Sequence, residues 1–440
     1  MTTTTADTTP QKGTSTGQSA LPQFYVGSEV GRLRKVIVHR PDLSLQRLTP
    51  GNHDELLFDD VLWVERAQRE HDQFVARLRE RDVEVLYVHD LLGEALAADD
   101  KVRRRLIGLL ASEHVVGPSL VEDVGRLLEA LPPERLAAHL IGGLTVGESG
   151  LDLRSVARRS LIAAAIEDEG TFILPPLPNT LFTRDSSCWI YGGVSINPMY
   201  WPARRREAYN MAAIYRGHPM FRDAGFEYWY PPLGDDDRFN AQDFGLASLE
   251  GGDVEILGRG TVLIGLSERT TARMIELIAR ALFAREGAER VIACVMSKDR
   301  AHMHLDTVFT MLDRDKVTAY PRVTEGIRAI SIRPGDRPGT LDIRPERDLL
   351  SAVADALHTR RLEVVETGGN RYQQEREQWD DGNNVVAIEP GVVIAYERNT
   401  YTIARMRAAG VEVIEIEGFE LGKGRGGGHC MTCPILRDGI

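Results

Sequence analysis

Residues 385–398 read VVAIEPGVVIAYER, two short apolar runs on either side of a Pro-Gly turn. Runs of this length around a turn dipeptide predict a β-hairpin. Asn384 stands directly before the first run. Three earlier segments repeat the pattern, and there Asp185, Asp253 or Asp306 opens the copy. The chain therefore contains an internal repeat whose unit begins with an acidic or amide side chain.

Each copy continues with an arginine before a predicted helix, and these residues are Arg204, Arg269, Arg322 and Arg398. Residues 31–41, GRLRKVIVHRP, are a candidate fifth copy. A unit of strand, strand, helix and strand cannot bury a core alone, so we expect the copies to pack radially about a pseudo-symmetry axis, as in a propeller. The opening polar residues would then converge on one centre. Hairpins that are alike through β-rich composition alone are the alternative, and the recurring polar residue argues against it.

The rest of the chain predicts an α/β protein with a helical insertion. Strands are expected at 33–39 and 83–88, and the apolar spacing over 60–81 is helical. From about 90 to 169 the sequence is rich in Leu and Ala with a 3.6-residue period. We expect a catalytic α/β body at 23–90 and 170–440, an inserted all-helical subdomain at 91–169, and a disordered Thr-rich tail at 1–22.

Composition narrows the class of partner. The 440 residues carry 53 Lys plus Arg against 65 Asp plus Glu, and the net charge of −12 disfavours nucleic acid. No apolar stretch approaches the roughly 18 residues of a membrane helix, and the tail is no secretory signal. Four cysteines are too few for a disulfide framework. We therefore expect a cytoplasmic protein with no membrane partner.

Several polar residues stand where predicted strands begin. Alternate residues of a strand share a face, so His304 and Asp306, which run into the strand expected at 307–311, should point the same way. Glu250 and Asp253 flank two glycines before another strand, and Asp185 opens a third. A solvated strand edge or an ordinary acidic turn would look the same for any one of these segments.

The C-terminal segment supplies a candidate nucleophile. Five of the seven residues at 422–428 are glycine, and His429 and Cys430 follow. Glycines allow a backbone to lie against a ligand, which a simple connection does not require. This segment therefore indicates a functional loop that carries Cys430.

One Cys, one His and several carboxylates suit a cationic substrate. Clustered carboxylates match the fixed N–H geometry of a guanidinium, whose central carbon is a poor electrophile that needs a thiolate. A histidine beside the adduct can protonate departing ammonia and then activate water. The residues thus predict conversion of a guanidine to a urea.

The same residues carry a resemblance to a known family. The chain resembles an arginine deiminase of the guanidine-modifying superfamily in PNTLFTRD (178–185), NPMYWPARRRE (197–207), EGGDV (250–254), SERTT (267–271), HLDTVF (304–309), DGNNV (381–385), EPGVVIAYERN (389–399) and GRGGGHC (424–430). The resemblance implies a five-bladed α/β propeller with an inserted helical domain. It also implies hydrolysis of L-arginine to L-citrulline and ammonia, a catabolic role, no cofactor or metal, and a homo-oligomer, dimer or tetramer.

The resemblance also implies roles for single residues. Cys430 resembles the nucleophile, His304 the general acid and base, Asp185 and Asp306 the guanidinium ligands, and Glu250 the acid that orients the histidine. The implied substrate-binding residues are Asn179, Phe182, Arg204, Asp253, Arg269 and Arg425. Arg205 and Arg206 are adjacent candidates for the carboxylate role of Arg204.

Other functions remain open. A metal-dependent amidohydrolase would use His302-x-His304-x-Asp306 as ligands, although no second ligand pair is evident. A redox protein would use Cys430 and Cys433, which have the spacing of a redox pair. Within the superfamily, an amidinotransferase or a methylarginine hydrolase would share the chemical residues. A non-catalytic binding module would require one of the chemical positions to be absent.

Overall fold

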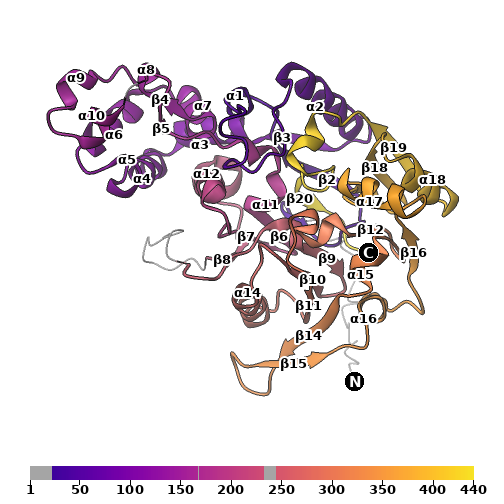
Figure 1. The fold of residues 1–440 in the computed structure, drawn as a ribbon. Coiled ribbons are helices and arrows are strands. Elements are labelled where there is room, and N and C mark those ends of the chain that lie inside the picture. Colours follow the sequence, from indigo (N-terminus) through magenta and orange to yellow (C-terminus); the bar gives the residue numbers. More distant parts are fainter. Residues whose placement is uncertain (1–21, 167, 232–243) are drawn as a thin grey trace, which may run out of the picture.

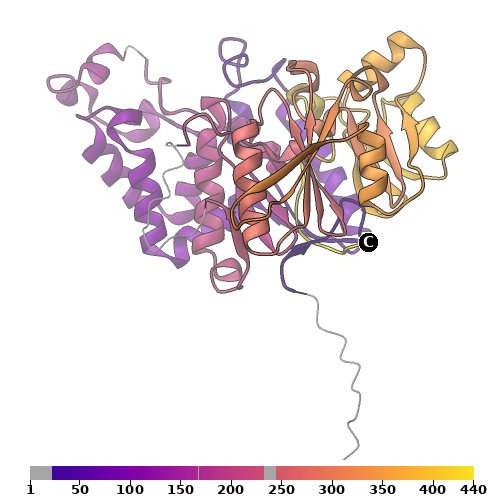
Figure 2. The ribbon, with the colours of Figure 1, turned by 90° about the horizontal axis from the view of Figure 1, so that it is seen from below.

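The computed structural model describes residues 22–166, 168–231 and 244–440 and has a mixed α/β fold (Figure 1). The predicted tail therefore lies, but for its last residue, outside the described residues. Figures 1 and 2 show the helices of residues 88–165 on one side of the molecule and β19 with α18 on the opposite side. The strands β6, β7, β9 and β10 lie between them.

Five sheets share one pairing pattern. In each, a first strand pairs antiparallel with a second, and the second pairs parallel with a third. In that order the strands are β6 (Ser187–Ile190), β7 (Gly193–Ile196) and β8 (Glu227–Tyr230); β9 (Val254–Gly258), β10 (Thr261–Leu266) and β11 (Arg290–Val295); β12 (Phe309–Asp313), β13 (Lys316–Ala319) and β16 (Glu363–Glu366); β17 (Val386–Glu389), β18 (Val392–Tyr396) and β19 (Glu412–Ile416); and β20 (Cys433–Arg437), β2 (Leu33–Val38) and β3 (Glu84–Tyr87).

In each of these five sheets a helix lies in the connection between the second strand and the third, as a parallel pair requires. These helices are α12 (Arg205–Gly217), α14 (Ala272–Ala284), α16 (Leu349–Ala356), α18 (Thr400–Ala408) and α2 (Val64–Arg79). The fifth sheet joins the two ends of the chain, because C-terminal β20 pairs with N-terminal β2. The candidate fifth repeat at residues 31–41 thus supplies a strand, while its partner strand comes from the C-terminus.

The remaining strands extend these sheets or stand apart. The two-residue β1 (Tyr25–Val26) pairs with β20, and β14 (Arg328–Pro334) with β15 (Leu341–Pro345) extends the sheet of β11. Figure 1 shows the β14–β15 hairpin projecting from the body. The short β4 (Leu144–Thr145) pairs with β5 (Phe172–Leu174). Because β4 lies within 91–169, the prediction that this segment is all-helical is wrong there.

The segment at 88–165 is mostly helical, as the periodicity over about 90–169 predicts. Its helices are α3 (Val88–Ala98), α4 (Asp100–Leu110), α5 (Glu113–Val116), α6 (Val121–Ala130), α7 (Pro133–Gly142), α8 (Val146–Ser149), α9 (Leu153–Val156) and α10 (Leu161–Ala165). Gly117 follows the last residue of α5, and Pro132 stands directly before α7. Leu92 and Leu140 belong to the same buried cluster as Trp189 of the body. These helices therefore share a hydrophobic core with the sheet of β6, β7 and β8 and the sheet of β9, β10 and β11.

A helical turn precedes the first strand of three sheets. These turns are α11 (Thr183–Ser186), the 3₁₀ helix η3 (Gly251–Asp253) and the 3₁₀ helix η5 (Leu305–Thr307). The turn α11 packs against η3, and η3 packs against η5. The polar openings of these repeats therefore meet at one place.

The prediction of a strand at 307–311 is wrong at its first two residues. The strand β12 begins only at Phe309, and Leu305–Thr307 form η5. The Thr307 hydroxyl donates to the His304 carbonyl at 2.7 Å, and the Leu305 N–H donates to Asp253 at 2.9 Å. These side-chain hydrogen bonds stabilise a turn in place of the sheet ladder. His304 and Asp306 therefore do not share a strand face.

Other short elements complete the described chain. They are α1 (Leu43–Gln46), α13 (Pro219–Arg222), α15 (Pro321–Thr324), α17 (Arg371–Trp379), η1 (Pro178–Leu181), η2 (Pro202–Arg204), η4 (Arg300–His302) and η6 (Leu421–Gly424). No helix of the described residues combines the length and the apolar character that a bilayer crossing requires.

Candidate active site

Cys430 lies at the end of the glycine-rich loop that begins with η6. Its side chain is 3% exposed, and its Sγ lies 3.3 Å from Asp306 Oδ2. Burial raises the pKa of the thiol well above its usual value, and the carboxylates of Asp306 and Asp185 raise it further. In the ligand-free protein the sulfur therefore keeps its proton at neutral pH. A bound cation would oppose the effect of the two carboxylates.

His304 lies between two carboxylates. Its Nε2 is 2.8 Å from Glu250 Oε2, and its Nδ1 is 3.8 Å from Asp185 Oδ1. Burial alone would lower the pKa of His304, but the Asp185 carboxylate and the hydrogen bond to Glu250 outweigh it and raise the pKa to about 9. The imidazole is therefore charged at neutral pH and can donate a proton.

Asp306 presents one free oxygen inside the protein. Its Oδ2 is 2.8 Å from His429 Nδ1, whereas its Oδ1 is buried without a partner among the described residues. Burial alone would raise the pKa of Asp306, but the hydrogen bond to His429 outweighs it, so the net shift is downward. The unpartnered Oδ1 of an ionised carboxylate is suited to accept an N–H from a ligand.

Asp185 already has partners in the protein. Arg204 Nη1 donates to its Oδ2 at 2.7 Å, and the backbone N–H of Gly252 donates to its Oδ1 at 3.0 Å. A Cβ at Gly252 would stand 2.7 Å from His304 Nδ1, so only glycine fits between the acid and the histidine. A guanidinium at this carboxylate would share it with Arg204.

Glu250 connects His304 to Arg269. Its Oε2 accepts from Arg269 Nη1 at 3.0 Å as well as from His304. Burial alone would raise the pKa of Glu250, but the charges of Arg269 and His304 outweigh it and hold the pKa well below its usual range. Arg269 Nη2 faces the weakly accepting sulfur of Met303 at 3.4 Å. This end of Arg269 is therefore available to a stronger acceptor.

Arg204 is more fully paired than Arg269. It donates to Glu207 Oε2 from Nη2 at 2.9 Å and to the carbonyl of Asn179 at 3.2 Å, in addition to Asp185. The Asn179 amide in turn donates to the Leu56 carbonyl at 2.6 Å. Arg204 and Asn179 thus lie together beside Asp185, and all three side-chain nitrogens of Arg204 are bonded to the protein.

The neighbouring arginines face elsewhere. The Arg205 guanidinium lies 5.2 Å from the centre of the Phe244 ring, and Arg206 donates to the Pro175 carbonyl. Neither has a hydrogen bond to Asp185 or Glu250. Of the three candidates, Arg204 is the one next to the acids.

The glycine loop packs on Phe182. A Cβ at Gly424 or at Gly426 would stand 2.6 or 2.5 Å from carbons of the Phe182 ring. Between these glycines, Arg425 has a left-handed backbone with φ 64°, and its guanidinium carbon lies 3.4 Å from the centre of the Trp379 ring. Phe182 thus lies under the loop that carries Cys430, and Arg425 points to α17.

Asp253 has both carboxylate oxygens occupied. Oδ2 accepts from the Ser267 hydroxyl at 2.6 Å, and Oδ1 accepts from the Leu305 N–H at 2.9 Å. Burial raises the pKa of Asp253 to about 7. The hydrogen bond to Leu305 fixes the turn next to His304, and both carboxylate oxygens accept from donors of the protein.

Among the described residues, one group of side chains has metal-ligand geometry. Ligand atoms of Asp185, Glu250 and His304 lie within 4.8 Å of one another. Arg204 and Arg269 already supply positive charge to the two carboxylates, at 2.7 and 3.0 Å. These donors are thus engaged in ion pairs, which does not fit a dedicated metal site.

His302 and Asp306, the other two ligands expected of a metal site, are not part of that group. The His302 ring has a partner elsewhere. Its Nε2 lies 2.7 Å from the Ser297 hydroxyl.

Three residues near Cys430 had no role assigned from the sequence. Asn384 contacts the sulfur through Nδ2 at 3.2 Å. His429 lies between Asp306 and Glu29, with Nε2 3.1 Å from Glu29 Oε2. The repeat alignment could have identified Asn384, because it occupies the opening position that the aspartates hold elsewhere. Nothing local marks Glu29, which is 400 residues from His429.

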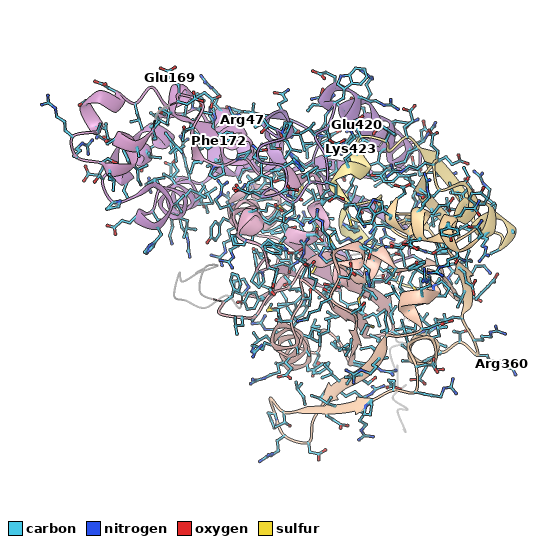
Figure 3. All side chains as sticks on the ribbon, in the orientation of Figure 1. Arg47, Glu169, Phe172, Arg360, Glu420 and Lys423 are labelled. Atoms are coloured by element: carbon cyan, nitrogen blue, oxygen red, sulfur yellow. The ribbon has the colours of Figure 1, made fainter. Side chains whose placement is uncertain are left out.

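The glycine loop is anchored on α2. The Glu420 N–H donates to Glu70 Oε2 at 2.9 Å, and Lys423 Nζ lies 3.1 Å from Glu420 Oε2. Figure 3 shows Glu420 and Lys423 side by side next to α2. The loop that carries Cys430 is thus tied at its start to the N-terminal part of the chain.

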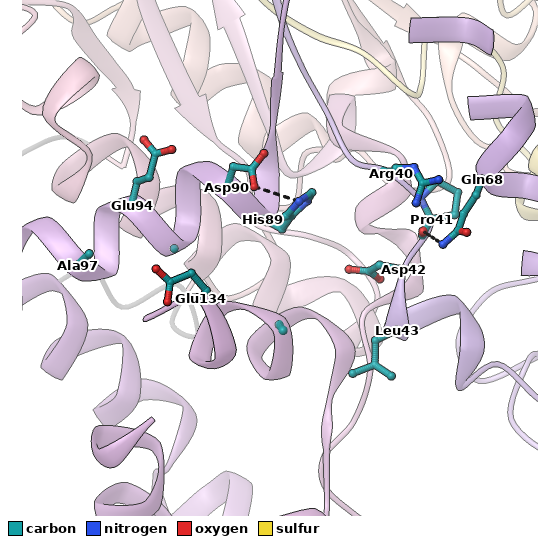
Figure 4. Close-up of a pocket in the computed structure, with 12 residues that line it drawn as sticks. Arg40, Pro41, Asp42, Leu43, Gln68, His89, Asp90, Glu94, Ala97 and Glu134 are labelled. Carbon is teal, nitrogen blue, oxygen red and sulfur yellow. Dashed lines mark hydrogen bonds and ion pairs between the residues drawn. The ribbon is translucent and has the colours of Figure 1, made fainter. Parts of the chain in front are cut away.

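The pocket in Figure 4 lies away from these residues. It has a volume of about 530 Å³ and lies among α1, α2, α3 and α7. Several of its polar groups pair locally, as Arg40 with Asp72 at 2.7 Å and His89 with Asp90 at 3.1 Å. It contains none of the site residues expected from the sequence.

Comparisons with known proteins agree with this geometry. A family model described as arginine deiminase matches residues 54–437. An amidinotransferase of saxitoxin biosynthesis from Microseira wollei has a similar structure, at 14% identity, covering 95% of this chain and 98% of its own, with a TM-score of 0.54.

Two further solved structures match at lower scores. The inosamine-phosphate amidinotransferase StrB1 from Streptomyces griseus matches at 13% identity over 95% and 97% of the chains, with a TM-score of 0.49. DDAH from Pseudomonas aeruginosa matches at 15% identity over 91% and 99%, with a TM-score of 0.47. At such identities the similarity shows the fold alone. The argument for the fold uses the amidinotransferase from Microseira wollei, whose TM-score is 0.54.

Proposed function

The chain belongs to the arginine deiminase family, and from this premise we propose that it hydrolyses L-arginine to L-citrulline and ammonia. The membership itself supports a guanidine-modifying enzyme. The proposal of arginine deiminase activity in particular rests on one observation. Five side chains lie together in one buried cluster: Cys430, Asp306, Asp185, His304 and Glu250. These residues come from four separate segments of the chain, and the two aspartates share the role of guanidinium ligand.

The first half-reaction uses the two aspartates and the thiol. The substrate guanidinium lies between Asp306, whose Oδ1 is free, and Asp185. Its positive charge favours ionisation of the Cys430 thiol, which releases its proton to solvent, and the resulting thiolate attacks the guanidinium carbon. A C–S bond forms, and the carbon becomes tetrahedral. His304 then gives a proton to one amino group, the C–N bond breaks, and ammonia leaves.

The second half-reaction reverses the role of the histidine. The neutral His304 takes a proton from water, and the hydroxide adds to the carbon of the thiouronium intermediate. The C–S bond breaks with its electron pair on sulfur, and the carbon becomes the carbonyl of citrulline after loss of the hydroxyl proton to solvent. Glu250 keeps His304 oriented through both steps by its 2.8 Å hydrogen bond.

The amino-acid end of the substrate has candidate ligands on the Asp185 side. Arg269 is the strongest candidate for binding the substrate carboxylate, because the acceptor that its Nη2 contacts is the weakly accepting sulfur of Met303. Arg204 would have to exchange a present partner for the ligand, whereas the Asn179 amide nitrogen has one hydrogen bond to the protein and a second N–H to offer. Phe182 and Arg425 would pack around the guanidino group, and Asp253 would act through the His304 turn.

The architecture that we propose is a five-bladed α/β propeller. The five sheets with one pairing order, and the closure of the fifth by both chain ends, support it. We also propose that residues 23–90 and 170–440 form the catalytic body and 91–169 the inserted helical subdomain. A cytoplasmic location and a dimer or tetramer are further proposals, which cell fractionation and light scattering test.

Product analysis over a substrate series tests the function. We expect ammonia and citrulline from L-arginine, and much slower ammonia release from agmatine, methylarginines and free guanidine. Preference for agmatine would contradict the roles of Arg204 and Arg269. Amidino transfer to an added amine without ammonia release would identify an amidinotransferase.

A further inference from the structure

Asn384 has every hydrogen-bonding group of its side chain engaged at the nucleophile. Its Nδ2 donates to Cys430 Sγ at 3.2 Å and to the Asp306 carbonyl at 3.3 Å. Its Oδ1 accepts from the backbone N–H of Cys430 at 3.1 Å and of Gly427 at 3.0 Å. A primary amide has two donor hydrogens and two acceptor lone pairs, so no capacity remains.

These partners fix the direction of the amide. Two backbone N–H groups face Oδ1, and a flipped amide would point N–H donors at both. The side chain is fully buried, so water cannot rescue a flipped orientation. An N–H of Asn384 is therefore directed at the sulfur.

The sulfur needs such a donor. Burial and the Asp306 and Asp185 carboxylates all disfavour the thiolate of Cys430. A hydrogen bond donated to sulfur favours the charged form, because the anion is the better acceptor. Among the contacts of Sγ, Asp306 accepts and Asn384 donates.

We propose that Asn384 is a catalytic residue whose Nδ2–H stabilises the Cys430 thiolate, while its Oδ1 holds the backbone of the nucleophile loop. This inference rests on the proposed function only for the identity of the substrate group that the thiolate attacks. Asn384 donates a hydrogen bond and keeps both amide protons, so no bond to it forms or breaks. Its position at the opening of a repeat makes it the neutral counterpart of Asp185 and Asp306.

The neighbouring asparagine is a matched control. Asn383 is equally buried, and it bonds Thr318 at 2.7 Å and Thr367 at 2.8 Å, with no contact to Cys430. Asn383→Ala therefore removes a buried amide from the same turn and leaves the sulfur contact intact.

The test measures ionisation of the thiol without substrate. Thiolate absorbance at 240 nm is followed against pH as the difference between each protein and its Cys430→Ala counterpart. Alkylation of Cys430 by iodoacetamide is followed in parallel by tandem mass spectrometry, which separates it from Cys433. The variants are Asn384→Ala, which removes the donor without adding charge, and Asn384→Asp, which keeps both acceptor contacts to the loop but replaces the donor by a negative charge. The inference therefore requires a rise in Asn384→Ala as well.

We expect about 10- to 100-fold less thiolate at a given pH in both Asn384 variants, a rise of roughly one to two pH units in the midpoint. Asn383→Ala should keep the wild-type midpoint even if it unfolds at lower temperature. Coincident titrations of wild type and Asn384→Asp would overturn the inference, as would an equal rise in Asn383→Ala. A shifted midpoint in a protein that does not turn over arginine would support the inference and contradict the proposed function.

Discussion

Replacement of Glu250 by glutamine should lower the pKa of His304 and move the alkaline limit of activity. Glu250 Oε2 accepts from His304 Nε2 at 2.8 Å, and His304 has a pKa of about 9 against 6.5 for the free side chain. A hydrogen bond to a charged group contributes about 1.5–3 kcal/mol, which corresponds to about one to two pKa units. We therefore expect the pKa of His304 in Glu250→Gln at roughly 7 to 8.

The same change has a consequence for stability. The pKa of His304 is raised in the folded protein, so its contribution to stability is complete below pH 6.5 and is lost as the pH rises through about 9. That contribution is on the order of 3 kcal/mol in the wild type and should be smaller in the variant. Glu250→Gln also removes the fully buried charge partner of Arg269 and leaves it with Glu268, 3.2 Å from its Nε, so the cost should stay below the roughly 3–5 kcal/mol of an unpaired buried charge.

Two measurements separate these effects. NMR titration of the His304 ring, assigned by comparison with His304→Gln, gives its pKa directly, and urea unfolding at several pH values gives stability. Glu207→Gln is the control, because Glu207 binds the buried Arg204 but does not touch His304. An unchanged His304 pKa in Glu250→Gln, with activity lost only in proportion to folded protein, would refute the orienting role of Glu250.

Three further predictions concern the nucleophile and its surroundings. Cys430→Ala should abolish citrulline formation while Cys433→Ala keeps most of it, and equal loss in both would favour a redox pair. Gly426→Ala brings a Cβ to 2.5 Å from the Phe182 ring, so kcat/KM should fall roughly tenfold or more with unchanged circular dichroism, whereas Gly125→Ala, with open space around its Cβ, should match wild type. Exhaustive dialysis against a chelator should leave citrulline production intact, and activity restored only by added metal would indicate a metallohydrolase.

Local sequence patterns predicted most of the secondary structure. The hairpin of β17 and β18 falls where two apolar runs flank Pro390-Gly391, and the helix expected at 60–81 is found as α2 (Val64–Arg79). These elements depend on periodicity and turn residues within a short window. The helices at 88–165 followed from the 3.6-residue period for the same reason.

The turn at His304 could not be predicted in this way. The helix η5 exists because Asp253, fifty-two residues earlier in the chain, accepts from the Leu305 N–H. A strand pattern gives no sign of such a long-range hydrogen bond. The two side chains consequently face different partners, His304 towards Glu250 and Asp306 towards Cys430.

The chemical residues were recognisable by type, but their partners were not. Cys430, the carboxylates and His304 suggested guanidine chemistry from the sequence. That Arg204 already binds Asp185, and that both oxygens of Asp253 face protein donors, required the folded chain. Asn384 was recognised as the opening of a repeat without its contact to the sulfur, because an amide carries no charge that marks it as chemical.

Attachment of arginine to Cys430 during turnover is the step that distinguishes this chemistry most directly. Isotope-labelled arginine, rapid acid quench and intact-mass analysis, followed by peptide mapping, should reveal protein heavier by arginine less ammonia, with the label on Cys430. The label should disappear as substrate is exhausted. Steady citrulline production with Cys430 unlabelled at every quench time would contradict covalent catalysis by this thiol.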